Sequence, residues 1–249
     1  MMKCQTVMDM LERLAPKKMA EDWDNPGLLA GSPQQEVHKV MTCLDVSIPV
    51  VEAAIKESVD MIVAHHPMIF KGVRHLRTDL YDGKMFQMLL SHNIAVYAAH
   101  TNLDIAEGGV NDVLAQAVGL EKIESFVITD AEKGFSLGRI GYLPQVKSLD
   151  EFVMDVKKGL HISHVRIVRG SNKPVRKVAL CSGAGAEFGS KAAFKGADVY
   201  LTGDVKYHEA QGAVQQGINL IDAGHFGTEF PVVQVLADYL TAEAAKMKK

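Results

Sequence analysis

The feature that most restricts the fold is the alternation of short apolar strands with helices, in which several strands run directly into polar clusters. Residues 60–64 (DMIVA) form one such apolar stretch, and His65 and His66 follow it at once. Residues 94–98 form another, which ends in a polar cluster over residues 100–104. Short β-branched stretches between segments with helical periodicity are typical of a largely parallel sheet covered by helices. The sequence therefore predicts an α/β fold.

The expected elements continue this alternation along the whole chain. Strands are expected over residues 37–46, 60–64, 94–98, 135–143, 164–168, 177–181, 199–202 and 218–222. Helices are expected over residues 49–57, 80–91, 109–118, 149–160, 187–195, 206–215 and from residue 230 onward. We expect two α/β domains with mostly parallel sheets flanked by helices. The C-terminal segment returns to the first domain, so residues 1–123 with 201–249 form the larger domain and residues 124–200 the smaller one.

Composition excludes several other classes of protein. Of the 249 residues, 47% are hydrophobic and 23% are charged, as in ordinary globular proteins, which argues against a disordered or fibrous chain. The net charge is −3 and there is no long run of Lys or Arg, so binding to nucleic acid is not expected. No apolar run approaches the roughly 20 residues of a membrane-spanning helix. We therefore expect neither a nucleic acid nor a membrane as a partner.

The cysteines and the N-terminus indicate the compartment. Cys4, Cys43 and Cys181 lie far apart with no CxxC spacing, which argues against a disulfide framework and against a thiolate zinc site. The N-terminal segment MMKCQTVMDMLERL is amphipathic and contains acidic residues, so it is predicted to be a helix and not a signal peptide. A reducing compartment, the cytoplasm, is expected.

Four polar clusters follow predicted strands, over residues 64–70, 98–104, 201–210 and 222–229. In open α/β sheets, ligands bind beyond the carboxyl ends of the strands, so these clusters are expected to meet at one pocket. Their imidazole and carboxylate groups suit zinc, manganese or iron better than calcium or copper(I). Five ligands exceed what one open zinc site needs, and a bridging carboxylate would allow two ions about 3.5–4 Å apart. The candidate ligands are His65, His66, Asp104, His225 and Glu229.

The spacing of these residues adds some detail. His225 and Glu229 are four residues apart, which places both on one face if a helix begins at Gly224. His65 and His66 are neighbours and could both bind metal only if the chain turns there, as Pro67 permits. The alternative is that one or two of these histidines are hydrogen-bonded supporting or core residues.

Further polar residues lie close to these motifs. His100 could orient a ligand, or could be a hydrogen-bonded residue at a strand end. Asp204 and His208 are four residues apart and could share a helix face as proton-transfer groups, although Asp204 also suits a helix N-cap. Asp24 and Asn25 are interpreted as turn-forming residues and Trp23 as part of the core. The glycine-rich stretch over residues 182–185 could bind an anion, but a structural strand-to-helix turn is favoured because it lacks both phosphate-binding motifs.

Five segments in order resemble the Nif-three-like family, whose members are also named GTP cyclohydrolase I type 2 homologues. The resemblance implies two α/β domains, a toroidal homohexamer and a dinuclear metal site with two divalent ions per chain. The length indicates the short form, without the domain that some relatives have inserted in the middle. Pro26 stands where the family motif has an aliphatic residue, outside the ligand set. The segments are EDWDNPGLL (21–29), AHHPMIF (64–70), HTNLD (100–104), GDVKYHEA (203–210) and GHFGTE (224–229), and the implied ligands are His65, His66, Asp104, His225 and Glu229.

Two classes of function agree with such a centre. The first is a metal-dependent hydrolase acting on a nucleotide-like substrate; the family name suggests GTP ring opening, a phosphoester would suit the same ions, and no residue specifies guanine. The second is a protein that delivers or stores metal, or serves as a ring-shaped scaffold, without turnover. Asp204 and His208 discriminate between them, because hydrolysis is favoured if they point at the metals. A closed coordination sphere would favour metal handling.

Overall fold

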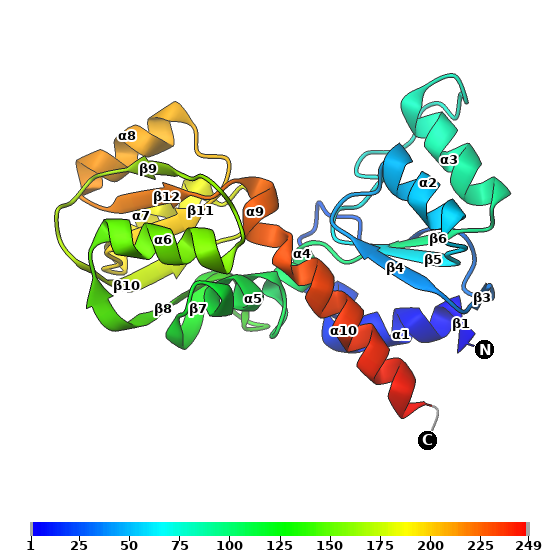
Figure 1. Ribbon diagram of the computed structural model, residues 1–249, viewed down its shortest axis with the longest axis horizontal. Coiled ribbons are helices and arrows are strands. Elements are labelled where there is room, and N and C mark those ends of the chain that lie inside the picture. The colour runs from blue at the N-terminus through cyan, green and yellow to red at the C-terminus, as the bar shows by residue number, and fades with distance from the viewer. Residues whose placement is uncertain (1, 248–249) are drawn as a thin grey trace. The chain divides into compact units, whose positions relative to one another are not determined.

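The computed structural model describes residues 2–247, which divide into two compact units (Figure 1). Unit 1 contains the residues up to Ala106 together with those from Val233 onward, and unit 2 is Glu107–Val232. These boundaries differ from those predicted. Residues 201–232 belong to unit 2 because strands β11 (Val199–Thr202) and β12 (Asn219–Asp222) complete its sheet.

Unit 1 is built on a four-stranded sheet in the order β2-β6-β5-β4. β4, β5 and β6 are parallel, as expected, while β2 pairs antiparallel with β6 and was not anticipated. Two short strands, β1 and β3, form a separate antiparallel pair. The bounds are β1 Met2–Lys3, β2 Gly27–Ala30, β3 Glu36–Val37, β4 Val40–Cys43, β5 Met61–Ala64 and β6 Ala95–Ala98.

Helices cover both faces of the sheet of unit 1. Side chains of a strand alternate between its faces, and in β4 Met41 and Cys43 join the core under α2 and α3, which Val51 and Leu89 help to fill. On the opposite face, the hydroxyl of Tyr239 in α10 donates to the carbonyl of Met10 in α1 at 2.8 Å. The helices are α1 Cys4–Leu14, η1 Lys17–Met19, α2 Ile48–Lys56, α3 Tyr81–Ser91, α4 Thr101–Ile105 and α10 Pro231–Lys246.

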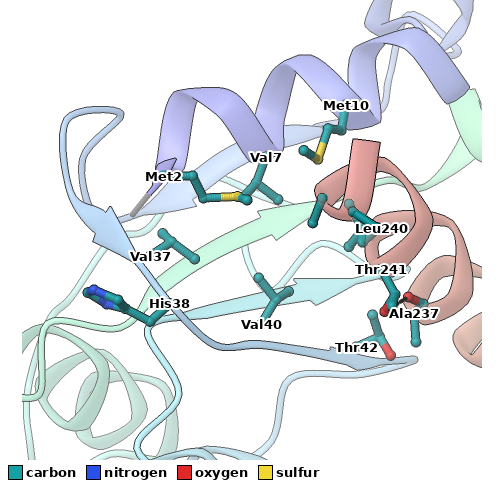
Figure 2. A pocket seen from close by; sticks show the side chains of 12 residues that line it. Met2, Val7, Met10, Val37, His38, Val40, Thr42, Ala237, Leu240 and Thr241 are labelled. Carbon is teal, nitrogen blue, oxygen red and sulfur yellow. Dashed lines mark hydrogen bonds between the residues drawn. The ribbon is translucent and has the colours of Figure 1, made fainter. Parts of the chain in front are cut away.

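A pocket of about 380 Å³ lies in unit 1 among α1, α10 and β4. Figure 2 shows Val7 and Met10 of α1, Val40 of β4 and Leu240 of α10 around it, with Thr241 and His38 as polar members. Its remaining lining residues are also mostly apolar. None of the residues that line it belongs to the polar clusters after the strands.

Unit 2 contains a six-stranded sheet in the order β7-β8-β10-β11-β12-β9. Its centre, β10, β11 and β12, is parallel, whereas β7, β8 and β9 pair antiparallel with their neighbours, so this sheet is mixed and not mostly parallel. The α/β class is confirmed. The bounds are β7 Glu121–Asp130, β8 Phe135–Lys147, β9 Arg166–Val168, β10 Val175–Leu180, β11 Val199–Thr202 and β12 Asn219–Asp222.

Helices also cover both faces of this second sheet. Val178 and Leu180 of β10 face a core that Leu114 of α5 and Phe152 of α6 fill. Ala179, which lies between these two residues in β10, faces the opposite side of the sheet and a core that includes residues of α7 and α8. The helices are α5 Val110–Ala117, α6 Leu149–Gly159, η2 Ala186–Phe188, α7 Gly189–Phe194, α8 Tyr207–Gln216 and α9 His225–Glu229. Among residues 2–247, no helix is both long and apolar enough to cross a membrane.

Candidate metal-binding site

Three histidines of unit 1 lie together at the carboxyl ends of neighbouring strands. His65 and His66 follow β5, and His100 follows β6. One ring nitrogen from each lies within 4.8 Å of the others. Because β5 and β6 are parallel and Ala64 pairs with Ala98, both chains leave the sheet at the same edge. The chain bends at residues 65 and 66, so the two neighbouring histidines are not held to opposite faces of a strand.

Each of these histidines is oriented through its Nδ1 atom. Nδ1 of His65 donates to the carbonyl oxygen of Ala99 at 2.8 Å, and Nδ1 of His66 lies 2.8 Å from Oδ1 of Asp45. Nδ1 of His100 lies 2.7 Å from Oδ1 of Asp24. An oxygen partner on Nδ1 fixes the proton there and leaves the lone pair on Nε2, which is the usual arrangement around a metal-binding histidine.

Asp24 holds His100 and the start of α4 from a fully buried position. Its side chain is 0% exposed, and besides His100 it accepts hydrogen bonds from the backbone N–H and the hydroxyl of Thr101, at 3.0 and 2.5 Å. Burial by itself raises the pKa of Asp24, but the hydrogen bonds from His100 and Thr101 together outweigh it and lower that pKa to about 2. A permanent carboxylate therefore stands behind the His100 ring.

Asp104 adds a carboxylate to the histidines of unit 1. It lies on the short helix α4, which was not predicted, and it is 8% exposed. Its Oδ1 atom is 3.7 Å from Nε2 of His65. Asn102 fixes this helix, because its buried side chain accepts from the backbone N–H of His100 and donates to the carbonyl of Ala15. Unit 1 thus presents three imidazoles and one carboxylate in fixed positions.

In unit 2, His225 and Glu229 are the first and last residues of α9. Their separation of four residues brings Nε2 of His225 to 3.2 Å from Oε2 of Glu229, as the spacing predicted. Glu229 is buried, and Nδ1 of His225 lies 2.8 Å from Oδ2 of Asp204. Hydrogen bonding to Glu229, against the effect of burial, raises the pKa of His225 to about 9; the charge of Glu229 and then Asp204 add to this effect.

Asp204 and His208 do not share a helix face. The helix α8 begins at Tyr207, so Asp204 lies before it, in a left-handed conformation with φ 54°, and the N-cap is Lys206. Asp204 instead holds the ring of His225, while the exposed His208 ring lies edge-on to Tyr207 at a centroid distance of 5.3 Å. The expected helical arrangement is therefore wrong, and a role of either residue in proton transfer remains a prediction.

Gly183 packs directly against the buried carboxylate of unit 2. It has φ +61°, and a Cβ atom placed on it would lie 2.2 Å from Oε1 of Glu229. Its N–H donates to the hydroxyl of Thr228 at 2.9 Å, and the N–H of Ser182 donates to Asn111. These two amides are used inside the protein, which supports the structural interpretation of the glycine-rich stretch over the anion-binding one.

The donor set fits a borderline divalent ion. Both units offer imidazole nitrogens and carboxylate oxygens, and within residues 2–247 the groups of side chains that could hold a metal contain no thiolate. This chemistry suits zinc, manganese or iron. His100, which was considered only as a supporting residue, has its ligand-type nitrogen among those of His65 and His66.

Several residues of the candidate site were missed or misassigned from the sequence. Asp24 was interpreted as a turn-forming residue and Asp45 was not considered, yet each carboxylate orients a histidine. Trp23 was assigned to the core, but it is 58% exposed because the buried side chain of this turn is Asp24. In the sequence, the position of Asp24 inside the motif EDWDN was the one indication that it belongs to the candidate site.

Replacing Asp24 with Asn is expected to lower the free energy of unfolding by about 2 kcal/mol at pH 7. The amide would face at least one donor that the carboxylate now satisfies. Because the folded pKa of Asp24 is depressed, this stabilisation is present above its ordinary pKa and is lost as pH falls through about 2. Urea unfolding followed by the fluorescence of Trp23, the single tryptophan of the chain, measures the difference. Asp22→Asn, at an exposed neighbouring position, is the control, and an equal effect of both variants would contradict this assignment.

The fold of this chain is shared with known proteins. The family model of Duf34/NIF3 (NGG1p interacting factor 3) matches residues 2–249. A protein of Clostridium acetobutylicum named "GTP cyclohydrolase 1 type 2 homolog" is 35% identical over 247 residues, which cover 99% of this chain and 92% of that protein. The crystal structure of a Bacillus cereus protein related to NIF3 superposes with a TM-score of 0.93 at 28% identity, covering 100% of this chain and 94% of that one.

A longer relative shows how this chain differs in length. A Halalkalibacterium halodurans protein of the same name is 28% identical over an alignment of 326 residues, which covers 89% of this chain and 88% of that protein. Since this chain has 249 residues, the relative contains a long insertion that the chain lacks. The short form that the length indicated is thereby confirmed.

Proposed function

The chain belongs to the Duf34/NIF3 (NGG1p interacting factor 3) family, and from this premise we propose that it is a metal-dependent hydrolase with a dinuclear centre, acting on a nucleotide-like substrate. Each chain would hold two divalent ions, with zinc, manganese or iron as the candidates. His100 is added to the predicted set because its ring nitrogen lies with those of two other ligands. The proposed ligands are His65, His66, His100, Asp104, His225 and Glu229.

The observation that best supports metal binding is the common orientation of the histidines. In His65, His66, His100 and His225 alike, Nδ1 faces a carboxylate or carbonyl oxygen at 2.7–2.8 Å. Three of these rings, those of His65, His66 and His100, also bring one ring nitrogen each within 4.8 Å of the others. The Nδ1 contacts fix the rings with Nε2 available as the ligand atom.

The metal ions and the residues of the chain would have different roles in this reaction. The ions, when bound, would polarise the substrate and lower the pKa of a coordinated water molecule. Asp104 and Glu229 would supply the carboxylate oxygens that hold the ions. Asp24, Asp45 and Asp204 hold the Nδ1 protons of their histidines and keep the rings in place. The nucleotide-like substrate is inferred from the name of the relatives, which refers to GTP.

Metal handling without turnover is the second candidate, and one observation favours it. Asp204 is engaged with His225, and His208 lies against Tyr207 on the exposed side of α8, so neither stands out as a dedicated acid or base. A protein that stores or delivers metal, or a scaffold, would need none. Turnover by the metal-loaded protein separates the two candidates.

We also infer a toroidal homohexamer and a cytoplasmic location. The ring follows from the family resemblance, and light scattering on the purified protein would measure it as the mass of six chains. The location agrees with thiol chemistry: Cys4 is buried, and burial raises the pKa of Cys43 to about 12, so these thiols behave as structural apolar groups.

The test of the metal centre is the variant Glu229→Gln, compared with the wild type by elemental analysis after metal loading. Because the amide loses the charge and one acceptor of a buried ligand, we expect two ions per wild-type chain and at least one fewer in the variant. Glu124→Gln, an exposed position on β7, is the control and should bind metal as the wild type does. A nucleotide hydrolysis panel run on the same samples tests the reaction.

The outcomes separate the proposals. A metal content well below one ion per wild-type chain would contradict the proposed dinuclear centre. The wild type could instead hold its full metal content and hydrolyse no nucleotide faster than Glu229→Gln does. This result would contradict the hydrolase proposal and support metal handling.

A further inference from the structure

Two large aromatic side chains of unit 1 lie exposed and in contact with each other. Trp23 is 58% exposed and Phe70 is 49% exposed, and their ring centroids are 5.7 Å apart with an angle of 58° between the planes. Rings of this size bury a large apolar area when they are placed in a core. An exposed pair therefore leaves an apolar surface available to another ring.

The pair continues into the histidines. The ring centroid of His100 lies 6.0 Å from that of Trp23 and 6.3 Å from that of Phe70, both nearly edge-on. His100 in turn lies 5.3 Å from His65 and 5.6 Å from His66. We name Trp23 and Phe70 the aromatic wall. It adjoins the proposed metal ligands within a single unit.

The backbone beneath the aromatic wall is fixed. Trp23 precedes Asp24, whose buried carboxylate is bound to His100 and Thr101. The side-chain amide of Asn25 donates to the carbonyl of Ile69 at 2.7 Å, which ties the Trp23 turn to the residue before Phe70. Exposed rings on a fixed backbone lose little further entropy when a ligand binds, so the surface is preorganised.

We propose that the aromatic wall stacks against a planar heteroaromatic ring of the substrate, a nucleobase, and positions it beside the metal-binding histidines. Aromatic faces bind bases of any sequence because every base presents a π surface. The two rings by themselves form too small a surface for a stable interface between chains, which needs several hundred Å² from each partner, and both rings adjoin the ring of His100. The inference rests on the proposed function and specifies the part of the substrate that the protein would recognise.

The test uses the intrinsic fluorescence of Trp23, because it is the single tryptophan of the chain. Metal-loaded wild-type protein is excited at the red edge of tryptophan absorption and titrated with guanosine 5′-monophosphate or with ribose 5-phosphate. We expect a saturable change with the nucleotide and none with the sugar phosphate. Phe70→Leu keeps an apolar side chain but removes the ring, and it should weaken nucleotide binding by roughly tenfold.

Controls keep the test independent of folding and of metal binding. Leu76→Ala removes another exposed apolar side chain of the same segment and should bind the nucleotide as the wild type does. Elemental analysis and circular dichroism of Phe70→Leu should match those of the wild type. Equal responses to both ligands, or unchanged affinity in folded Phe70→Leu, would overturn the aromatic wall. A fluorescence change that depends only on protein concentration would also overturn the proposal, because it would show that the aromatic wall contacts a second copy of the chain.

Failure of the aromatic wall and failure of the proposed function give different results. If nucleotides are hydrolysed and Trp23 does not respond, the wall is wrong and the hydrolase stands. If the base binds and Phe70→Leu weakens it while no nucleotide is hydrolysed, the wall stands and the reaction is wrong.

Discussion

Replacing Gly183 with alanine is expected to lower the affinity of the protein for zinc by at least about tenfold, the effect of misplacing a metal ligand. The new Cβ atom would lie 2.2 Å from Oε1 of Glu229 and 3.2 Å from Nε2 of His225. The carboxylate is the end of a flexible side chain, so it will move before the backbone does. The substitution therefore displaces one proposed ligand without changing its chemistry.

The matched control is Gly196→Ala. Gly196 has φ +71°, close to the φ of +61° at Gly183, but a Cβ atom there meets nothing within 4 Å. Both variants incur the cost of a left-handed alanine, of order 1 kcal/mol, which urea unfolding measures. Only Gly183→Ala should lose zinc in competition with a chromophoric chelator. Equal zinc affinity in the two variants would show that Glu229 is not a ligand or that it relaxes freely.

The candidate ligands were predictable because their positions follow from local rules. Polar residues after parallel strands meet at one edge of a sheet, which placed His65 and His66 with the cluster at residue 100. The spacing of His225 and Glu229 likewise needed only the pitch of a helix. In each case the relevant distance along the chain is short, or the strand pairing that joins the segments is the common parallel one.

The supporting residues were not predictable, because their partners lie far away in the sequence. Asp24 and His100 are 76 residues apart, and their pairing depends on how β2 adds antiparallel to the edge of the sheet beside β6. The predicted boundary between the units differs from the observed one for a similar reason. β11 pairs with β10 and β12 pairs with β11. The hydrophobic periodicity of a strand does not predict which other strand it pairs with.

Zinc affinity is also expected to rise steeply with pH, on the order of fiftyfold between pH 7 and pH 9, if one proton with a pKa near 9 must leave His225 before metal binds. In the metal-free protein, hydrogen bonding to Glu229 is the largest cause of the raised pKa of His225. The proton that forms this bond occupies Nε2, the atom that we propose as the ligand. Below the raised pKa, each pH unit therefore costs about a factor of ten in apparent affinity.

The same proton stabilises the metal-free fold, with the opposite dependence on pH. A folded pKa raised above the unfolded value gives stability that is complete below the ordinary histidine value and is lost as pH rises through about 9. Metal-free protein should therefore melt at a lower temperature at pH 9 than at pH 6.5. Metal-loaded protein should show little of this loss, because the bound ion replaces the proton on His225.

Asp204→Asn separates His225 from other titrating groups. Removing this carboxylate lowers the pKa of His225, so the rise in zinc affinity should shift to lower pH, and the affinity at pH 9 should fall because the ring is less firmly oriented. His164→Gln, at an exposed position of the same unit, should leave both curves unchanged. If Asp204→Asn follows the wild-type pH curve, the proton that competes with zinc does not reside on His225, because the Asp204 carboxylate acts on that ring directly.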